Sequence, residues 1–265
     1  MKRVILFTIC YSLFASYGQG SGTSLTFDGI DDYVNFQNVS TWNSTFSGPG
    51  KEFTFETWVR PAPTTNQQQF ILAKLGDNSC PSGSEDNRQL AFFLDDQFRP
   101  SFLFYSKRNL TLNYRLVSSQ ESVVVGEWVH LSVVYRADVA TGNGLDRVEI
   151  YLNGEGTNTL LVAAVGPLGD IPAADAPLSI GSRVSATGQR CEDGPYEFVG
   201  TIDEVRIWSR ALSQDEILNK MTERLAGAAP GLVAYYRMDE GMDDTCPGGQ
   251  DVCDASGNNN HGVKF

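Results

Sequence analysis

The strongest constraint on the fold of this chain is an apolar side chain at every second position, repeated in separate segments. It is clearest in FTFETWVR (53–60), WVHLSVVYR (128–136) and VEIYLNGE (148–155). Successive side chains of a β-strand point to opposite faces, so this period predicts strands with one face in an apolar core. The last segment turns at Asn153-Gly154, a strong hairpin signal because both residues tolerate a positive φ.

Further strands are predicted on either side of polar turns. AFFLDDQFRPSFLFY (91–105) has the pattern of two strands around a turn, and residues 110–117 form another apolar run. Short strands separated by Gly, Pro, Asn and Asp are typical of a sandwich. Neither a tandem repeat nor a linker divides the chain. We therefore expect an all-β fold of two antiparallel sheets in one large domain.

One helix is predicted, near the C-terminal third of the chain. It follows the strand-like run FVGTIDEVRIW (198–208). Ser213 and Glu216 have the spacing of a capping box, in which each side chain bonds the backbone N–H of the other residue. Apolar residues then recur at helical spacing at Ile217, Leu218, Met221 and Leu225. We expect about three turns, ending before Pro230 and covering one side of the sandwich.

The N-terminus has the pattern of a secretory signal peptide over residues 1–18. A basic start precedes an apolar stretch over residues 4–14, and small residues stand at Ser16 and Gly18, before the expected cleavage point. Residues 19–265 would then form the mature domain. No other stretch reaches the ~18 apolar residues that a membrane span requires. We expect a secreted or cell-surface protein without a transmembrane segment.

The charge of the chain restricts its partners. The formal net charge is −12, and removal of Lys2 and Arg3 with the signal would make it −14. An acidic surface repels phosphate backbones and anionic lipid surfaces, so nucleic acid is excluded as an expected partner. Carbohydrate, an extracellular protein or a divalent cation remains compatible with this charge.

Four cysteines remain after residue 18, and their even number in an exported chain suggests disulfides. Three pairings are possible. Cys246 and Cys253 are seven residues apart in a loop rich in Gly, Pro and Asp, which favours a local bridge and leaves Cys80 with Cys191. Free or zinc-bound cysteines are the alternative, but no pair has the close spacing of a zinc site.

The ordered set of motifs resembles the LamG-like jellyroll domain, a concanavalin A-like sandwich related to the pentraxins. The residues that carry the resemblance are LTFDGIDDYVNF (25–36), FTFETWVRP (53–61), WVHLSVVY (128–135), VEIYLNGE (148–155), LSIGSR (178–183), FVGTIDEVRIWSRALSQDEI (198–217) and GLVAYYRMDEG (231–241). The motif core covers about residues 53–210. The resemblance implies a jellyroll in which Val205 and Ile207 point inward and the helix packs over one face. Most members of the family are not catalytic and bind sugars, proteins or surfaces, often with calcium.

The resemblance also implies a ligand region in two loops. In pentraxins the positions that match Asp86, Asn87 and Asp193 bind calcium, and the Cys80–Cys191 bridge would hold their loops together. Glu85 and Glu192 flank these positions, and Tyr196 would supply a ring on the ligand side. The triplet Arg183-Val184-Ser185 has no carboxylate where pentraxins have ligands, so we expect one calcium ion at most. Glu56 and Ser132 stand where pentraxins have a disulfide.

Two further acidic clusters are compatible with calcium or with ordinary turns. One comprises Asp28, Asp31 and Asp32. The other comprises Asp239, Asp243, Asp244, Asp251 and Asp254. Asp residues in loops often bond their own backbone, and we expect turns at both clusters.

An enzyme is the less favoured interpretation. Laminarinase-type glycosidases carry alternating acids on one strand, with the two catalytic carboxyl groups about 5–5.5 Å apart, and no Glu-x-Asp-x-Glu run occurs here. Asp203 and Glu204 are adjacent, and in a regular strand they would point to opposite faces. They stand where the strand is expected to begin, and they are expected to bond backbone groups or to pair with Arg206 or Arg210. A structural calcium site shared with Asp28 is the less favoured alternative. His130 is expected to be a half-buried strand residue, so we assign no catalytic residue.

The sequence thus predicts a binding module for carbohydrate or a glycoprotein surface. A protein–protein adhesion module is the alternative, and a glycoside hydrolase is less favoured. Exposed aromatic rings would favour sugar, because rings stack on pyranose faces. The candidates are Trp42, Trp58, Tyr105 and Tyr196.

Overall fold

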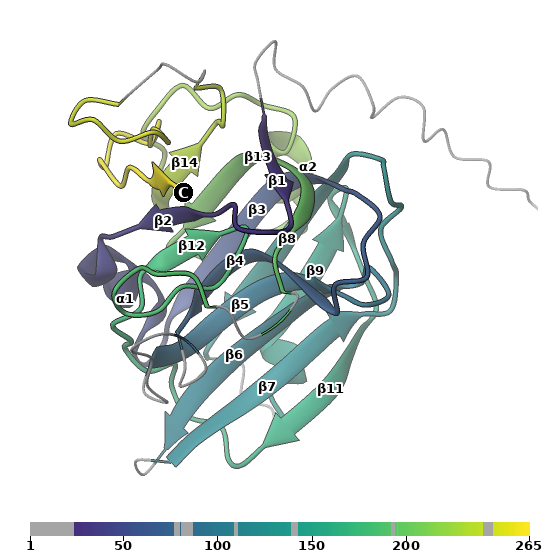
Figure 1. Cartoon of the computed structure of the whole chain (residues 1–265). Coiled ribbons are helices and arrows are strands. Elements are labelled where there is room, and N and C mark those ends of the chain that lie inside the picture. The colour runs from purple at the N-terminus through teal and green to yellow at the C-terminus, as the bar shows by residue number, and fades with distance from the viewer. Residues whose placement is uncertain are drawn as a thin grey trace, which may run out of the picture.

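The alternating segments form two antiparallel sheets that stack face to face (Figure 1). The computed structural model describes residues 24–76, 80, 87–108, 111–138, 143–191, 194, 196–240 and 246–265. The seven-stranded sheet contains, in spatial order, β1 (Leu25–Asp28), β13 (Val199–Trp208), β3 (Glu52–Pro61), β8 (Val129–Arg136), β9 (Val148–Leu152) and β10 (Glu155–Gly156), with β14 (Leu232–Tyr236) also paired to β13. The predicted all-β sandwich is confirmed.

The eight-stranded sheet forms the second layer. Its spatial order is β11 (Thr159–Val165), β7 (Thr111–Ser119), β6 (Pro100–Arg108), β5 (Arg88–Asp95), β4 (Gln68–Leu75), β12 (Leu178–Ile180), β2 (Val34–Phe36) and β15 (Val263–Lys264). The predicted strands on either side of the turn at residues 95–99 are β5 and β6. The Asn153-Gly154 turn joins β9 to β10, with φ of 51° and 79° at its two residues.

The core between the sheets is rich in aromatic side chains. Phe53 and Phe55 from the seven-stranded sheet approach Phe102 from the eight-stranded sheet, with ring centroids 6.2 and 6.3 Å apart. Val205 and Ile207 lie in the same core, as the resemblance implied. Burial of such rings is the main favourable term in the folding free energy, and it fixes which face of each strand remains outside the core.

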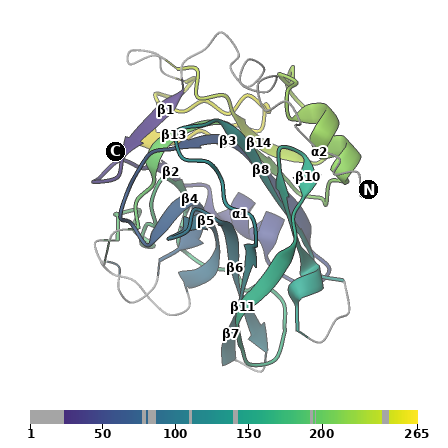
Figure 2. The same cartoon turned by 90° about the vertical axis from the view of Figure 1, so that its right-hand side faces the viewer.

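Helix α2 (Gln214–Lys220) covers the outer face of the seven-stranded sheet (Figure 2). Both hydrogen bonds of the predicted capping box are present, and the Ser213 hydroxyl accepts from the Glu216 backbone N–H at 3.3 Å. The helix has two turns rather than the expected three. It ends because strand side chains bond its last carbonyls: Arg206 donates to Lys220 at 2.7 Å, and Trp58 donates to Met221 at 2.8 Å.

A second helix, α1 (Val39–Phe46), shows that the expectation of a single helix was wrong. Its sequence, VSTWNSTF, is dominated by residues of modest helix propensity, and no side chain caps its first turn. Tertiary packing stabilises it instead: Trp42 and Phe46 are fully buried, and the Trp42 indole N–H donates to the Phe36 carbonyl at 2.9 Å. A short 3₁₀-helix, η3 (Leu145–Arg147), precedes β9.

Two disulfides join loops of the sandwich. Cys80 pairs with Cys191, and Cys246 pairs with Cys253, so the favoured pairing is confirmed. The first bridge closes a separation of 111 residues along the chain and connects the segment after β4 to the segment before β13.

Candidate ligand-binding face

The loops joined by Cys80 and Cys191 contain the predicted calcium ligands, but the structure describes few of them. Asn87 is buried at the start of β5, and its Oδ1 accepts a hydrogen bond from the Asp175 backbone N–H at 3.1 Å. The other predicted residues, Glu85, Asp86, Glu192 and Asp193, lie outside the described residues. The described part of the set therefore supplies one amide oxygen, which already orients a neighbouring loop.

Tyr196 lies on the outer face of the eight-stranded sheet, beside β4. Its ring is half-buried and meets Phe70 edge-on, with centroids 6.1 Å apart and an interplanar angle of 76°. The Arg183 guanidinium lies 5.2 Å from the Tyr196 centroid, a cation–π distance. The Tyr196 carbonyl also accepts from the Phe70 backbone N–H. The tyrosine is thus fixed to the sheet face rather than carried on a free loop tip.

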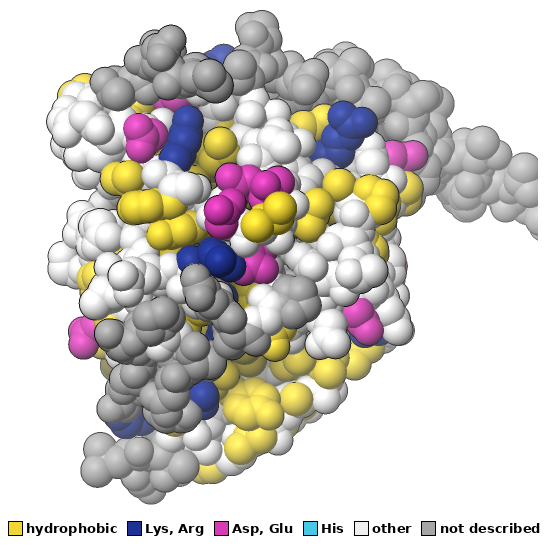
Figure 3. All heavy atoms as spheres, viewed as in Figure 1, with side chains coloured by type: hydrophobic (Ala, Val, Ile, Leu, Met, Phe, Trp, Pro, Cys, Tyr) yellow, Lys and Arg dark blue, Asp and Glu magenta, His cyan; other side chains and the backbone are white. Residues whose placement is uncertain are grey.

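Apolar side chains line this outer face in register. Cross-strand partners are Phe70 with Phe93, Ala73 with Ala91, Leu103 with Leu116, and Tyr105 with Tyr114. The members on β4 and β5 are buried, whereas those on β6 and β7 are half-buried. We call the latter four residues, Leu103, Tyr105, Tyr114 and Leu116, the β6–β7 platform. Figure 3 shows hydrophobic side chains gathered over this lower part of the sheet.

The two tyrosines give the β6–β7 platform its shape. The rings of Tyr105 and Tyr114 are 5.7 Å apart between centroids and are tilted by 47°. The Arg88 guanidinium lies 5.7 Å from the centroid of the Tyr105 ring. Aromatic rings combine a large apolar surface with a polar hydroxyl. A ligand with an apolar ring face and hydroxyl groups at its edge fits such a surface chemically.

A polar hollow of about 390 Å³ lies on the same face, near the turn between β5 and β6. Its lining residues are Gln67, Gln68, Phe93, Asp95, Asp96, Arg99, Ser101, Leu116, Ser118 and Val162. Asp95 accepts from the Arg99 side chain at 2.8 Å, and the hydroxyls of Ser101 and Ser118 are 2.6 Å apart. Because Leu116 belongs to both features, the polar hollow and the β6–β7 platform are continuous.

The structure separates the four aromatic residues that were candidates for sugar contact. Trp42 and Trp58 are 0% and 1% exposed and are structural. Tyr105 and Tyr196 both lie on the outer face of the eight-stranded sheet. Tyr114 was not predicted, although the alternation of Leu112, Tyr114 and Leu116 would have assigned it to one face of its strand. The sequence does not show which face of this strand lies under a helix and which face stays uncovered.

Asp203 and Glu204 lie inside β13, not at its start, and on the same outer face. A β-bulge between Asp203 and Arg206 adds a residue to the strand, and Glu204 has φ of 52°. The prediction of opposite faces was wrong because it assumed a regular pleat. Glu204 accepts from the Arg206 guanidinium at 2.9 Å and also from the Tyr235 hydroxyl. The expected pairing with Arg206 is confirmed.

Asp203 is the most perturbed acid of this bulge. The residue is 6% exposed, and its Oδ1 accepts from the Glu204 backbone N–H. Burial, followed by repulsion from Glu204, raises the pKa of Asp203 to about 7. The pair is enclosed in contacts with Arg206 and Tyr235, so its described role is to shape the strand and to anchor the chain after α2.

A Ser–His–Glu arrangement lies beneath α2, but all three residues are buried. The Ser132 hydroxyl is 3.4 Å from His130 Nδ1, and His130 Nε2 is 3.7 Å from Glu56 Oε1. Burial, with repulsion from Arg206, lowers the pKa of His130 to about 3. His130 was expected to be half-buried, and its 1% exposure corrects that expectation. Glu56 and Ser132 are direct cross-strand partners, as pentraxin disulfide positions would be.

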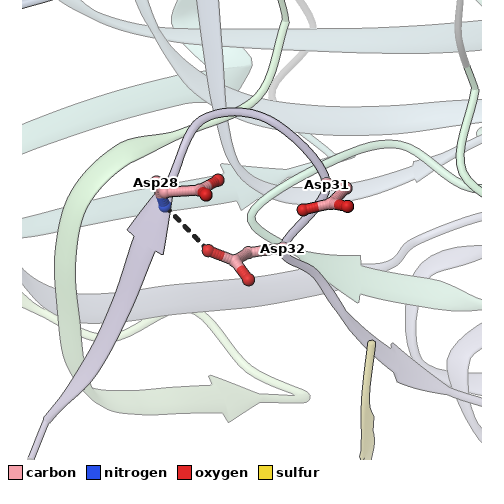
Figure 4. Close-up of side chains that lie close together, drawn as sticks. All are labelled: Asp28, Asp31 and Asp32. Carbon is pink, nitrogen blue, oxygen red and sulfur yellow. Dashed lines mark hydrogen bonds between the residues drawn. The ribbon is translucent and has the colours of Figure 1, made fainter.

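The acidic triad of Asp28, Asp31 and Asp32 is compact (Figure 4). One carboxylate oxygen from each residue lies within 4.8 Å of the others, a grouping that can hold a metal ion. Two of the carboxylates also perform turn chemistry: Asp32 accepts from the Asp28 backbone N–H, and Asp28 accepts from the Ile30 backbone N–H, both at 2.8 Å. The geometry of this triad is therefore compatible with a calcium site and with an ordinary turn.

The C-terminal acidic cluster forms turns and ion pairs in its described part. Asp254 accepts backbone hydrogen bonds from Tyr235, Ser256 and Asn260, and Asp239 pairs with Arg224. Asp251 accepts from the Lys264 backbone N–H. The two remaining members, Asp243 and Asp244, are outside the described residues. Within the part of the chain that is described, neither helix is long and apolar enough to span a bilayer.

Comparison with known proteins establishes the fold independently. The sequence model of the Concanavalin A-like lectin/glucanases superfamily matches residues 28–218. A solved structure from Bacteroides ovatus, described as a candidate carbohydrate binding protein, superposes with a TM-score of 0.52 at 19% identity. The alignment covers 91% of this chain and 58% of that chain, so this chain spans less than two thirds of that protein's length.

Two other solved structures are similar at lower scores. The carbohydrate-binding module CBM40 of a Ruminococcus gnavus sialidase, bound to alpha2,3 sialyllactose, has a TM-score of 0.48 and 15% identity, covering 74% of this chain and 98% of that one. A SAP-like pentraxin from Limulus polyphemus has a TM-score of 0.39 and 18% identity, covering 72% and 82%. A search of curated proteins gave no match.

Proposed function

The chain belongs to the Concanavalin A-like lectin/glucanases superfamily, and from that premise we propose that it is a non-catalytic module that binds carbohydrate. The observation that carries the proposal is the β6–β7 platform beside the polar hollow. The similarity to the Bacteroides ovatus protein, described as carbohydrate binding, is consistent with this assignment. The fold alone does not determine the function, so the argument depends on the chemistry of the outer face.

The outer face offers the two kinds of contact that a sugar requires. The rings of Tyr105 and Tyr114 can stack against the C–H face of a pyranose, an apolar contact. Acceptors at Asp95 and Asp96 and a donor at Arg99 can then bond sugar hydroxyls. Tyr196 extends the same face at the disulfide end, where the sequence predicted the ligand loops.

We also propose that the module is not catalytic, because the acidic side chains beneath α2 are buried or already bonded within the protein. Glu204 accepts from Arg206 and from the Tyr235 hydroxyl, and Asp203 accepts from the Glu204 backbone N–H. The Ser132–His130–Glu56 arrangement is buried and has no exposed nucleophile. A glycosidase needs two carboxyl groups that reach a substrate from opposite sides of its bond. The described acids under α2 do not have that access. The signal peptide predicted at residues 1–18 supports the further proposal of a secreted or surface-bound module, and both disulfides fit an oxidising compartment.

Calcium assistance remains a prediction within this function. The predicted set of Asp86, Asn87 and Asp193 has only Asn87 among the described residues. The alternative calcium site among the described residues is the triad of Asp28, Asp31 and Asp32. Adding calcium should raise the melting temperature if either set binds the ion. Loss of that rise in Asp193→Asn, but not in Asp31→Asn, would assign the ion to the predicted loops, and no rise in the unmodified protein would remove the calcium proposal.

A glycan array, followed by calorimetry on the best ligand, tests the carbohydrate proposal. We expect Tyr105→Ala and Tyr114→Ala each to weaken binding by about three- to tenfold, since an aromatic contact contributes about 0.5–1.5 kcal/mol. Tyr105→Phe and Tyr114→Phe are the matched controls, because they keep the stacking ring and remove only the hydroxyl. Binding that survives both alanine substitutions would refute the assignment to this face, and an array without any bound glycan would refute carbohydrate binding.

A further inference from the structure

A second hollow lies beside α2, where β10 is the last strand in the described order of the seven-stranded sheet. It has a volume of about 550 Å³ and is lined by residues of α2, the β9–β10 hairpin and the segment 121–129. Figure 2 shows α2 beside β10. We call it the α2 groove. Its apolar lining comprises Val123, Val124, Val129, Leu152 and Leu218, with Trp128 half-buried among them. Val124 and Leu218 are 57% and 38% exposed, so two walls of the groove present aliphatic side chains to solvent.

The charged residues that line the α2 groove are all acidic. They are Glu121, Glu127 and Glu155, each exposed, and no Lys or Arg is present among the described lining residues. Their described side-chain partners are neutral: Ser119 and Asn158 donate to Glu121, and Gln214 donates to Glu155 at 3.0 Å. These bonds orient Glu121 and Glu155 without neutralising their charge, so the groove combines negative charge with an apolar surface.

This combination favours a cation that is attached to an apolar group. The face of Trp128 is a good cation–π surface for a Lys or Arg side chain, and the three carboxylates complement the same positive charge. Valine and leucine walls favour an adjacent aliphatic or aromatic side chain. A sugar fits less well, because carboxylates only accept hydrogen bonds and the remaining walls are apolar. A second copy of this acidic chain, with a net charge of −12, is also a poor match.

The position of β10 adds a backbone argument. Glu155 and Gly156 form β10, the last strand in the described order of the seven-stranded sheet, and both residues line the α2 groove. An edge strand can pair with an extended segment from another chain. We propose that the α2 groove docks an extended peptide segment of a partner protein that carries a Lys or Arg beside a large apolar residue. This interaction is separate from the sheet face proposed to bind carbohydrate.

The test uses a library of short extended peptides with a fixed Leu-Arg or Leu-Lys pair and a matched library with Leu-Gln. Binding to the whole protein, with both disulfides intact, is measured by fluorescence anisotropy at low and high salt. We expect the cationic library alone to bind, with an affinity that falls as salt rises. Glu127→Gln and Glu155→Gln should each weaken binding by about two- to fivefold, as exposed ion pairs do, and Val124→Ser should weaken it through loss of apolar contact.

Glu223→Gln is the matched control, because Glu223 is an exposed acid just after α2 that does not line the groove. It should bind the peptides as the unmodified protein does. Tyr105→Ala should also leave peptide binding unchanged, which separates this proposal from the carbohydrate site. Equal binding of the Leu-Gln library, unchanged binding in the groove variants, or no peptide binding at all would overturn the proposal. So would a glycan whose binding is lost in the groove variants.

Discussion

The perturbed acid in the β13 bulge allows a sharp prediction for Asp203→Asn. The side chain of Asp203 is buried beside Glu204, and its pKa is raised from 3.8 to about 7. Between these two pH values the folded state holds a proton that the unfolded state has released. The contribution of this group to stability is therefore complete below pH 3.8 and is lost as the pH rises through 7. Asparagine has a similar shape and never carries the charge.

The size of the effect follows from the shift. A difference of about three pKa units corresponds to about 4 kcal/mol, and we expect about 2–4 kcal/mol once partial access of water is allowed for. The free energy of unfolding of Asp203→Asn should match that of the unmodified protein near pH 4 and exceed it by this amount at pH 8. The amide oxygen of asparagine can still accept from the Glu204 backbone N–H, so the bulge is retained.

Urea titrations at several pH values, followed by tryptophan fluorescence with both disulfides intact, measure this difference. Trp58 and Trp208 are buried under α2 and report unfolding of this region. Other groups titrate in both proteins and cancel in the comparison. Asp96→Asn is the matched control, because it removes an exposed carboxylate. Parallel stability profiles for the unmodified protein and Asp203→Asn would refute the argument that burial of Asp203 carries a pH-dependent cost.

Three further predictions concern the supports of the fold. Cys80→Ser should lower the free energy of unfolding by about 4–5 kcal/mol on the chain-entropy description of a long closed loop, and limited proteolysis should then cut near Cys191; unchanged protease resistance would contradict this. Arg206→Met should lower the free energy of unfolding by about 3–5 kcal/mol, since it leaves buried acids without their cation. Hydrogen exchange in α2 should become faster, and exchange as slow as in the unmodified protein would argue against an anchoring role. Gly154→Ala should lower the free energy of unfolding by about 1 kcal/mol or more, because φ is +79° and an added Cβ would lie 2.8 Å from Leu218. Thermal unfolding measures this loss, and an unchanged melting temperature would show that the turn adapts.

The fold was predictable from the sequence because its signals are local. Alternation places Phe53 and Phe55 in the core, Ser213 starts α2 through side-chain caps, and Asn153-Gly154 turns a hairpin. Each of these features depends on residues that are neighbours along the chain. Helix α1 was missed for the converse reason. Its stability comes from burial of Trp42 in the core, which no local pattern encodes.

The site was less predictable, since it depends on which surfaces other elements cover. The β-bulge that turns Asp203 and Glu204 to one side is an insertion in the pairing of β13 with β3, and it leaves no regular mark in the sequence. Tyr105 and Trp58 likewise stand in similar alternating strand sequences. They differ in exposure because α2 lies over the sheet that contains Trp58, and this arrangement is a property of the tertiary fold.

The asymmetry between the two outer faces has a specific cause. The seven-stranded sheet places Arg206 and Trp58 where they can donate to the last carbonyls of α2, so polar side chains hold a helix over that face. On β6 and β7 of the other sheet, the four positions of the β6–β7 platform carry leucine and tyrosine, and only the two tyrosine hydroxyls could donate to a helix end. No described helix covers this part of the sheet. Tyr105 and Tyr114 therefore stay half-buried on a face that no described helix covers, and this is the face to which we assign the proposed sugar contact.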